Sequence, residues 1–252
     1  MSFSPATSTE TNPPTYAGLT DPGRVRQQNQ DCWVADLKQG SYIVSDGVAG
    51  GFAGDLAAKY VVEALPRLLQ QRLHQFVGSI EAFPLQDVIV ELSNCLRSKA
   101  ENQPGLDGMG ATVVVALIQQ SQALIGHLGD SRAYLWRQGT LQQLTKDHAL
   151  VQLLLDCGEV TSEEAVSHPS RSQLTRYVGM GEPVLPEIQF VQLQPGDHLL
   201  LCSDGLTNML KDDELLTILN QEGTLQEACQ ALIDSANVAG GRDNITALLT
   251  RQ

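Results

Sequence analysis

The chain has 252 residues, of which 42% are hydrophobic, and the even spread of apolar runs favours one domain with a sizeable core. Its formal net charge is -13, and no Lys and Arg cluster could neutralise several phosphates of a nucleic acid. The longest apolar run, at residues 111–118, is far below the roughly 20 residues that a membrane span needs. A nucleic-acid partner and a membrane span are therefore excluded, whereas a small phosphorylated group could still be bound by one Arg and a metal.

The N-terminal stretch 1–15 is rich in Ser, Thr and Pro and contains neither Lys nor Arg nor an apolar segment. It resembles neither a secretory signal nor a transit peptide, so we predict a disordered tail over 1–15 and a single domain over 16–252. Five widely spaced cysteines without a CxxC pair predict reduced thiols and a cytoplasmic protein. They give little support to a thiolate metal site or a cysteine nucleophile.

The first elements are predicted to be a hairpin followed by two helices. Strand-like residues at 32–36 and 42–45 flank a turn at 38–41. Apolar residues then recur at spacings of three and four from Gly54 to about Leu73, and again over 85–99. These two stretches are predicted to form paired helices.

The rest of the chain predicts further antiparallel strands and a second group of helices. The expected strands are residues 112–118, 122–128, 133–137, 141–144, 187–193, 198–203 and 244–250. The closing helices are expected at 212–220 and 224–237. Between the two groups, residues 146–181 lose strand character and predict a helical excursion, with a helix over 149–157 ended by Gly158 and another capped by Ser162. Because hairpins and helices are segregated rather than alternating, the pattern favours an α+β layered domain.

One motif occurs twice and suggests a site. Asp46 and Asp204 each follow an apolar strand and a Ser, and each precedes a Gly. Three more aspartates stand in comparable places, namely Asp31, Asp130 and Asp243. A single Asp-Gly is most often a turn, but several carboxylates held together are unfavourable unless a cation offsets their charge. Oxygen donors without a His or Cys pair favour Mg²⁺ or Mn²⁺ over Zn²⁺.

Two such ions about 4 Å apart would make a bridging water a nucleophile for in-line attack on phosphorus. The missing side chain of Gly47 would let its carbonyl approach an ion, although a turn glycine is equally compatible with the sequence. The planar fork of Arg26 could bind two phosphoryl oxygens, although an Arg in a polar loop is often merely solvated.

Six motifs in order, running from about Ala17 to the C-terminus, closely resemble the bacterial-type members of the metal-dependent protein Ser/Thr phosphatases, the PPM family or type 2C. The motifs are Arg26-x-x-Asn29-Gln30-Asp31, Ser45-Asp46-Gly47, Gly108-x-Gly110-Ala111-Thr112, His127-x-Gly129-Asp130-Ser131-Arg132, Ser203-Asp204-Gly205 and Gly241-Arg242-Asp243-Asn244. The resemblance implies a four-layer α/β/β/α sandwich of two antiparallel sheets flanked by helices. It also implies a monomeric signalling enzyme that hydrolyses phosphoserine and phosphothreonine monoesters in proteins.

The same resemblance implies a role for each site residue. Asp46 would bridge two Mg²⁺ or Mn²⁺ ions and Gly47 would give its carbonyl to one of them, while Asp204 and Asp243 would bind the other. Asp31 would act through metal-bound waters, Arg26 would hold the substrate phosphate, and Asp130 with Asp204 would form a possible third, weaker site.

Residues 146–181 would be a flap beside the active site. In it His148, Arg171 and Arg176 look functional, although solvated charges and a helix contact explain them about as well. His127 is expected to pack or cap near Asp130 rather than to bind metal.

Several residues depart from the family pattern. Gln30 and Val48 stand where animal members carry a Glu and a His, so we expect metal-bound water to protonate the leaving group. Ala49, Phe52 and Asp55 replace a Gly, a His and a Gly. These changes keep open an alternative function as a catalytically weak, phosphoprotein-binding regulatory module, and a metal phosphodiesterase acting on nucleotides is a third, less favoured hypothesis.

Overall fold

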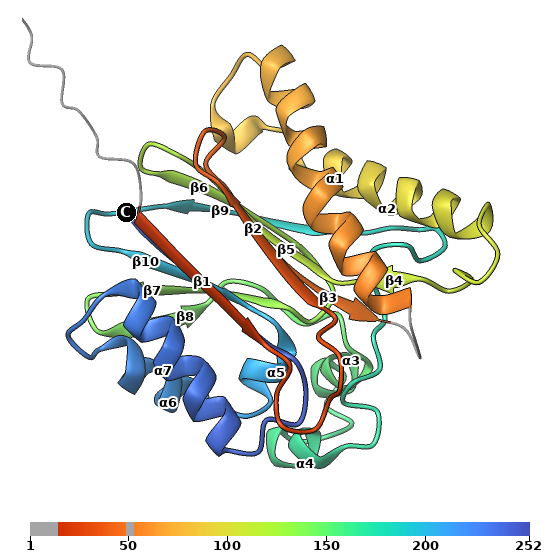
Figure 1. The fold of residues 1–252 in the computed structure, drawn as a ribbon. Helices are drawn as coiled ribbons and strands as arrows, with labels where there is room; N and C mark the ends of the chain where they lie inside the picture. The colour runs from red at the N-terminus through yellow and green to blue at the C-terminus, as the bar shows by residue number, and fades with distance from the viewer. Residues whose placement is uncertain (1–14, 49–52) are drawn as a thin grey trace, which may run out of the picture.

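A computed structural model describes residues 15–48 and 53–252 (Figure 1). Its strands are β1 (Thr15–Asp21), β2 (Asp31–Asp36), β3 (Ser41–Val48), β4 (Gly110–Ala111), β5 (Val113–Gln119), β6 (Gln122–Leu128), β7 (Arg132–Arg137), β8 (Thr140–Gln143), β9 (Glu187–Gln192), β10 (His198–Cys202) and β11 (Ile245–Arg251). Its helices are α1 (Ala53–Gln75), η1 (Ile80–Ala82), α2 (Leu85–Glu101), α3 (Leu150–Asp156), α4 (Ser162–Ser167), α5 (Asp204–Thr207), α6 (Asp212–Leu219) and α7 (Leu225–Val238). The predicted tail lies outside the described residues except for Thr15.

Two antiparallel sheets stack between two layers of helices (Figure 1). One sheet has the order β1-β11-β10-β7-β8, and the other has the order β2-β3-β5-β6-β9 with β4 paired to β3. Helices α1 and α2 cover the outer face of the second sheet, and α6 and α7 cover that of the first (Figure 1). The predicted four-layer sandwich is confirmed.

Strand β3 contributes side chains to two hydrophobic clusters, one on each face of its sheet. Side chains alternate between the faces of a strand, so Ile43 packs with α1 and α2 while Tyr42 and Val44 face the other sheet. Strand β10 does the same, because Leu200 packs toward α6 and α7 whereas Leu199 and Leu201 lie between the sheets. Both strands are buried on both faces, which is why their sequences are continuous apolar runs rather than alternating ones.

The first strand was not predicted from the sequence. β1 pairs along its whole length with β11, from Thr15 opposite Arg251 to Asp21 opposite Ile245. Gly18 breaks its short apolar pattern, and the break has a steric cause: a Cβ there would lie 2.9 Å from the ring of Trp33. The pairing partner is more than 200 residues away, so no local pattern identifies the strand.

Two predicted boundaries were wrong. The N-cap of α4 is Thr161 rather than Ser162, because Glu164 closes a capping box on Thr161: Thr161 Oγ1 accepts from Glu164 N–H, and Glu164 Oε2 accepts from Thr161 N–H. Asp46 lies within β3 rather than beyond its end, since Gly47 and Val48 continue to pair with Ala111 and Gly110. Among the described residues, no helix has the length and apolarity to cross a membrane.

Candidate functional site

Five aspartates from both sheets converge at one edge of the sandwich. Asp31 begins β2 and lies directly opposite Asp46 of β3. Asp130 follows β6, Asp204 is the first residue of α5 just after β10, and Asp243 precedes β11. Burial raises the pKa of Asp46 well above its usual value, and the charges of the other four aspartates raise it further. The five carboxylates that the sequence singled out are therefore close enough to repel one another.

Asp31 connects the two sheets. Its Oδ2 accepts hydrogen bonds from Ser203 Oγ at 2.6 Å and Thr246 Oγ1 at 2.7 Å, both from the opposite sheet. Burial raises its pKa to about 7, although these two hydrogen bonds lower it and the charges of Asp204 and Asp243 raise it. Its Oδ1 is buried and has no hydrogen-bond partner among the described residues. One oxygen is thus fixed, and the other is left for a ligand.

Asp204 presents a second buried oxygen. Asn208, one helical turn later, donates to its Oδ2 at 2.8 Å, whereas Oδ1 has no partner in the described part of the chain. Burial raises the pKa of Asp204 to about 6, with the charge of Asp243 adding to the rise and the hydrogen bond from Asn208 opposing it. Burial and the neighbouring charge of Asp204 also raise the pKa of Asp130 well above its usual value. Clustered carboxylates with unpartnered buried oxygens fit a hard divalent cation.

Thr112 fixes the backbone of Asp46. Its Oγ1 accepts from Asp46 N–H at 3.0 Å, and its own N–H donates to Asp46 C=O at 2.8 Å. Ser45 Oγ donates to Thr112 C=O at 2.7 Å, and Thr112 Oγ1 lies 2.6 Å from Ser131 Oγ. The two Ser residues of the repeated motif therefore have different tasks, because Ser45 supports a backbone segment whereas Ser203 binds a carboxylate directly.

Gly47 is required by the approach of α1. A Cβ at this position would lie 2.1 Å from the carbonyl oxygen of Gly54, in the first turn of that helix. The glycine lies within β3 and its N–H donates to Gln30 C=O at 3.1 Å, so it is not a turn residue. Gly47 therefore has no side chain that could keep an ion from its carbonyl, as was expected. The close approach of α1 is by itself a sufficient reason for a glycine at this position.

Arg26 lies over the same edge and pairs with Asp243. Its Nη2 is 2.8 Å from Asp243 Oδ2, and its side chain is 54% exposed. The loop that carries it is organised by Asn244, whose Nδ2 donates to the carbonyls of Pro22 and Gln28 and whose Oδ1 accepts from Gln30 N–H. The guanidinium is therefore held beside the carboxylates while remaining accessible to a ligand.

The predicted flap contains α3 and α4 and contacts the site at two places. Arg171 Nη2 donates to Asn208 Oδ1 at 2.5 Å, and Asn208 in turn binds Asp204. His148 is buried and contacts Gly129, next to Asp130. Asn208 and Thr246 were missed from the sequence, and Ser203 was noted only as part of the Ser-Asp-Gly motif, without a role. Asn208 had a local signal, since it stands four residues after Asp204 as the C-cap of α5.

Of the residues that depart from the family pattern, Gln30, Val48 and Asp55 are described, and Gln30 directly precedes β2. Val48 ends β3, and Asp55 lies in the first turn of α1, where a carboxylate suits the helix dipole. Ala49 and Phe52 lie outside the described residues.

The family model described as protein phosphatase 2C matches residues 23–249. The chain belongs to the protein phosphatase 2C family.

Relatives in this family are similar over nearly the whole chain. The serine/threonine phosphatase stp of Listeria innocua is 39% identical over 236 residues, covering 92% of this chain and 94% of the relative. The crystal structure of the serine/threonine phosphatase Stp1 from Staphylococcus aureus has a TM-score of 0.89 at 30% identity and covers 99% of both chains. The catalytic domain of the phosphatase PstP, solved in complex with two manganese ions, has a TM-score of 0.82 at 33% identity over 94% of this chain and 97% of that one. The chain is thus of the bacterial type.

Replacing Thr112 by Val should destabilise this phosphatase by about 1–3 kcal/mol, because a buried hydroxyl that serves Asp46 N–H and Ser131 Oγ is lost. Urea unfolding of the metal-free protein measures the change. Thr217→Val is the control, since that exposed hydroxyl bonds only to Asp213 C=O within α6, and its effect should stay within about 0.5 kcal/mol. Equal stabilities of the two variants would contradict the role assigned to Thr112 in fixing the backbone of Asp46.

Proposed function

We propose that this protein phosphatase hydrolyses phosphoserine and phosphothreonine monoesters in proteins, using Mg²⁺ or Mn²⁺ bound at the aspartate cluster. The observation that carries the proposal is the convergence of Asp31, Asp46, Asp130, Asp204 and Asp243, with buried unpartnered oxygens on Asp31 and Asp204. The two manganese ions named for the PstP catalytic domain support the same chemistry. The relatives named above give no support to a regulatory module without catalysis.

Each residue has a proposed role at the site. Asp46 and the Gly47 carbonyl would hold one ion, Asp46 with Asp204 and Asp243 the other, and Asp130 with Asp204 a third. When bound, the ions would supply an activated water and neutralise charge on the phosphoryl oxygens. Asp31 would act on water at its free Oδ1, because its Oδ2 is already occupied by Ser203 and Thr246.

Arg26 would bind the substrate phosphate. Its fork of donors matches two phosphoryl oxygens, and its present partner Asp243 is a carboxylate that a cation would compete for. Substrate and ions together would thus exchange the Arg26–Asp243 pair for an Arg–phosphate pair and a carboxylate–metal contact.

We further propose that the enzyme acts as a monomer in the cytoplasm, in phosphoprotein signalling. All the proposed ligands come from one chain, so the chemistry needs no second subunit.

The test is turnover of a phosphothreonine peptide by purified protein, first stripped of metal with a chelator and then supplied with Mn²⁺. Turnover should be absent in chelator and restored by the ion. Binding of the phosphopeptide without turnover at any Mn²⁺ concentration would support the regulatory module instead. Faster hydrolysis of bis-p-nitrophenyl phosphate than of p-nitrophenyl phosphate would support a phosphodiesterase.

A further inference from the structure

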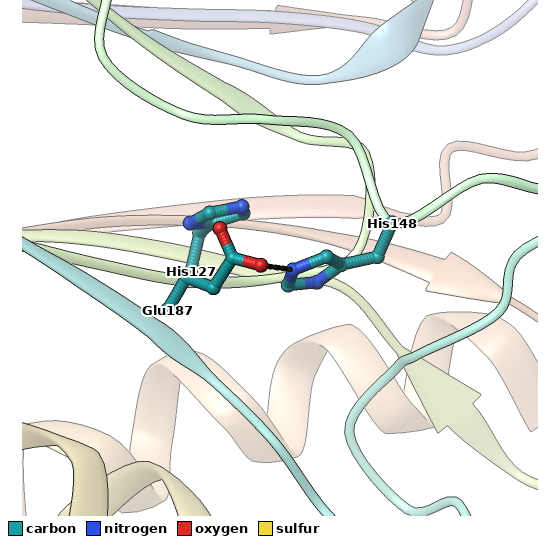
Figure 2. Close-up of side chains that lie close together, drawn as sticks. All are labelled: His127, His148 and Glu187. Atoms are coloured by element: carbon teal, nitrogen blue, oxygen red, sulfur yellow. Dashed lines mark ion pairs between the residues drawn. The ribbon is translucent and has the colours of Figure 1, made fainter. Parts of the chain in front are cut away.

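A second cluster lies beside the aspartates and comprises His127, His148 and Glu187 (Figure 2). His127 comes from β6, His148 from the start of the flap and Glu187 from the first position of β9. Each residue offers a ligand atom within 4.8 Å of the others. The spacing alone is compatible with a metal ion, so the orientation and hydrogen bonds of the side chains must decide.

The orientation and hydrogen bonds of these three side chains argue against a metal site. The two imidazole rings are stacked, with centroids 4.5 Å apart and planes at 13°. An ion binds in the plane of an imidazole, along a nitrogen lone pair, so two nearly parallel rings cannot direct lone pairs at one ion. The cluster also holds a cation already, because Arg176 Nη1 lies 3.0 Å from Glu187 Oε1 and 3.2 Å from His148 Nε2.

The hydrogen bonds of His148 define its tautomer. Its Nδ1 accepts from Gly129 N–H at 3.1 Å, so this nitrogen carries no proton. The proton of the neutral ring is then on Nε2, which faces Glu187 Oε1 at 3.3 Å, as the dashed line in Figure 2 indicates. Burial, helped by the nearby His127 and Arg176 and opposed by Glu187, lowers the pKa of His148 to about 4, so the ring is neutral near pH 7.

Gly129 is bound by His148 at both of its backbone groups. Besides the bond to the ring, His148 N–H donates to Gly129 C=O at 3.0 Å. Gly129 has a φ of +124°, and a Cβ there would lie 2.6 Å from Thr112 Cγ2, so no other residue fits this position. Its N–H lies beyond the end of β6, where a strand partner no longer satisfies it. The residue that follows is Asp130.

We propose that His148 is a positioning residue: it holds the Gly129 turn by two hydrogen bonds and so fixes the carboxylate of Asp130 in the aspartate cluster. Glu187 Oε1 faces the protonated Nε2 and so orients the ring, while Arg176 holds Glu187 through the same oxygen. Thr175 N–H, at the far end of the flap, donates to His148 C=O at 2.8 Å, so the docked flap and the Asp130 turn share one residue. The proposal rests on the proposed function, in which Asp130 binds a metal ion.

Three variants of His148 separate positioning from bulk packing. In His148→Asn, the side-chain oxygen can occupy the place of Nδ1 and still accept from Gly129 N–H. In His148→Gln, the side chain fills the space but its polar atoms lie near the former position of Nε2. His148→Ala removes both the volume and the polar atoms. His198→Asn is the control, because His198 is half-buried against Trp136 at the end of β10 remote from Asp204.

Amide hydrogen exchange of Gly129 in the metal-free protein gives the first readout, and calorimetric Mn²⁺ titration gives the second. His148→Ala and His148→Gln should accelerate exchange at Gly129 and weaken the Asp130-dependent Mn²⁺ site about tenfold or more. His148→Asn and His198→Asn should resemble the wild type in both. Adding His148→Ala to Asp130→Ala should not weaken Mn²⁺ binding further, because His148 acts through Asp130.

The proposal is overturned if His148→Ala and His148→Gln leave both readouts unchanged, if His148→Asn behaves like His148→Ala, or if the losses in the double variant add. Failure of the proposed function has a different signature. In that case Asp130→Ala would leave Mn²⁺ binding unaltered and the wild type would lack metal-dependent turnover, whereas exchange at Gly129 would still report on the hydrogen bond.

Discussion

Replacing Asp46 by Asn is expected to abolish metal-dependent turnover while making the metal-free protein more stable. Asp46 lies opposite Asp31, and the other four aspartates raise its pKa, so a neutral amide relieves repulsion among like charges. Its backbone bonds to Thr112 are unaffected by the change. Turnover should nevertheless fall at least about a thousandfold. Without the proposed bridging carboxylate the ions would no longer lower the activation free energy, a loss of about 4 kcal/mol or more.

Activity on a phosphothreonine peptide at saturating Mn²⁺ measures the first effect, and thermal unfolding in chelator at pH 8 measures the second. Asp87→Asn is the control, because it removes one negative charge from an exposed position on α2. It should leave turnover unchanged and, because Asp87 lies in the first turn of α2, lower the stability by no more than about 1 kcal/mol, opposite in direction to the effect expected of Asp46→Asn. An Asp46→Asn protein that keeps a tenth of the wild-type activity, or that unfolds at a lower temperature, would rule out the assigned role.

Without metal, the protein should become less stable as the pH rises from about 5.5 to 8. Burial raises the pKa of Asp31 to about 7 and that of Asp204 to about 6, above the usual value of 3.8. The folded state therefore holds more protons than the unfolded state between about pH 4 and pH 7, and stability falls as the pH rises through this window. The midpoint of unfolding should drop by on the order of 5 °C. Ordinary exposed carboxylates stay ionised above pH 5.5 and contribute little to this difference.

Mn²⁺ should reverse this trend, because ionised carboxylates bind the ion and ligand binding stabilises the folded state. The measurement is thermal unfolding at both pH values, in chelator and in Mn²⁺. Asp31→Asn tests the origin of the effect, since it removes one of the titrating groups and should flatten the pH dependence in chelator. The lowered pKa of His148 opposes the trend by stabilising the protein as the pH rises, so the decisive comparison is between the two proteins. An Asp31→Asn midpoint that falls with pH as steeply as that of the wild type would contradict the raised pKa of Asp31.

Much of the site could be predicted because its residues sit in local patterns. An apolar run, a Ser, an Asp and a Gly mark the ends of buried strands, and strands of one sandwich can bring such ends to a common edge. The exact place of Asp46 could not be predicted, because β3 continues past it only by pairing with the two-residue strand β4, more than 60 residues away. The roles of the individual ligands remain predictions.

The supporting hydrogen bonds had no local signal. Ser203 and Thr246 reach Asp31 across 172 and 215 residues of sequence, and His127 meets His148 only after the flap folds back on β6. Contacts of this kind depend on how the sheets stack, which neither periodicity nor motif spacing determines. They are also the contacts that set the pKa and orientation of the groups at the site.

The division of the aspartates between two sheets would make the proposed activity sensitive to sliding of one sheet over the other. Asp31, Asp46 and Asp130 move with one sheet, Asp204 and Asp243 move with the other, and the Ser203 and Thr246 bonds to Asp31 link the two across their interface. The interior between the sheets, where Tyr42 packs near Leu248, therefore sets the alignment of the two half-sites. If the aspartates bind metal ions as proposed, a small slip between the layers would separate the ligand oxygens well before it unfolded the protein. Packing in the interior of the sandwich would then control the geometry of the site.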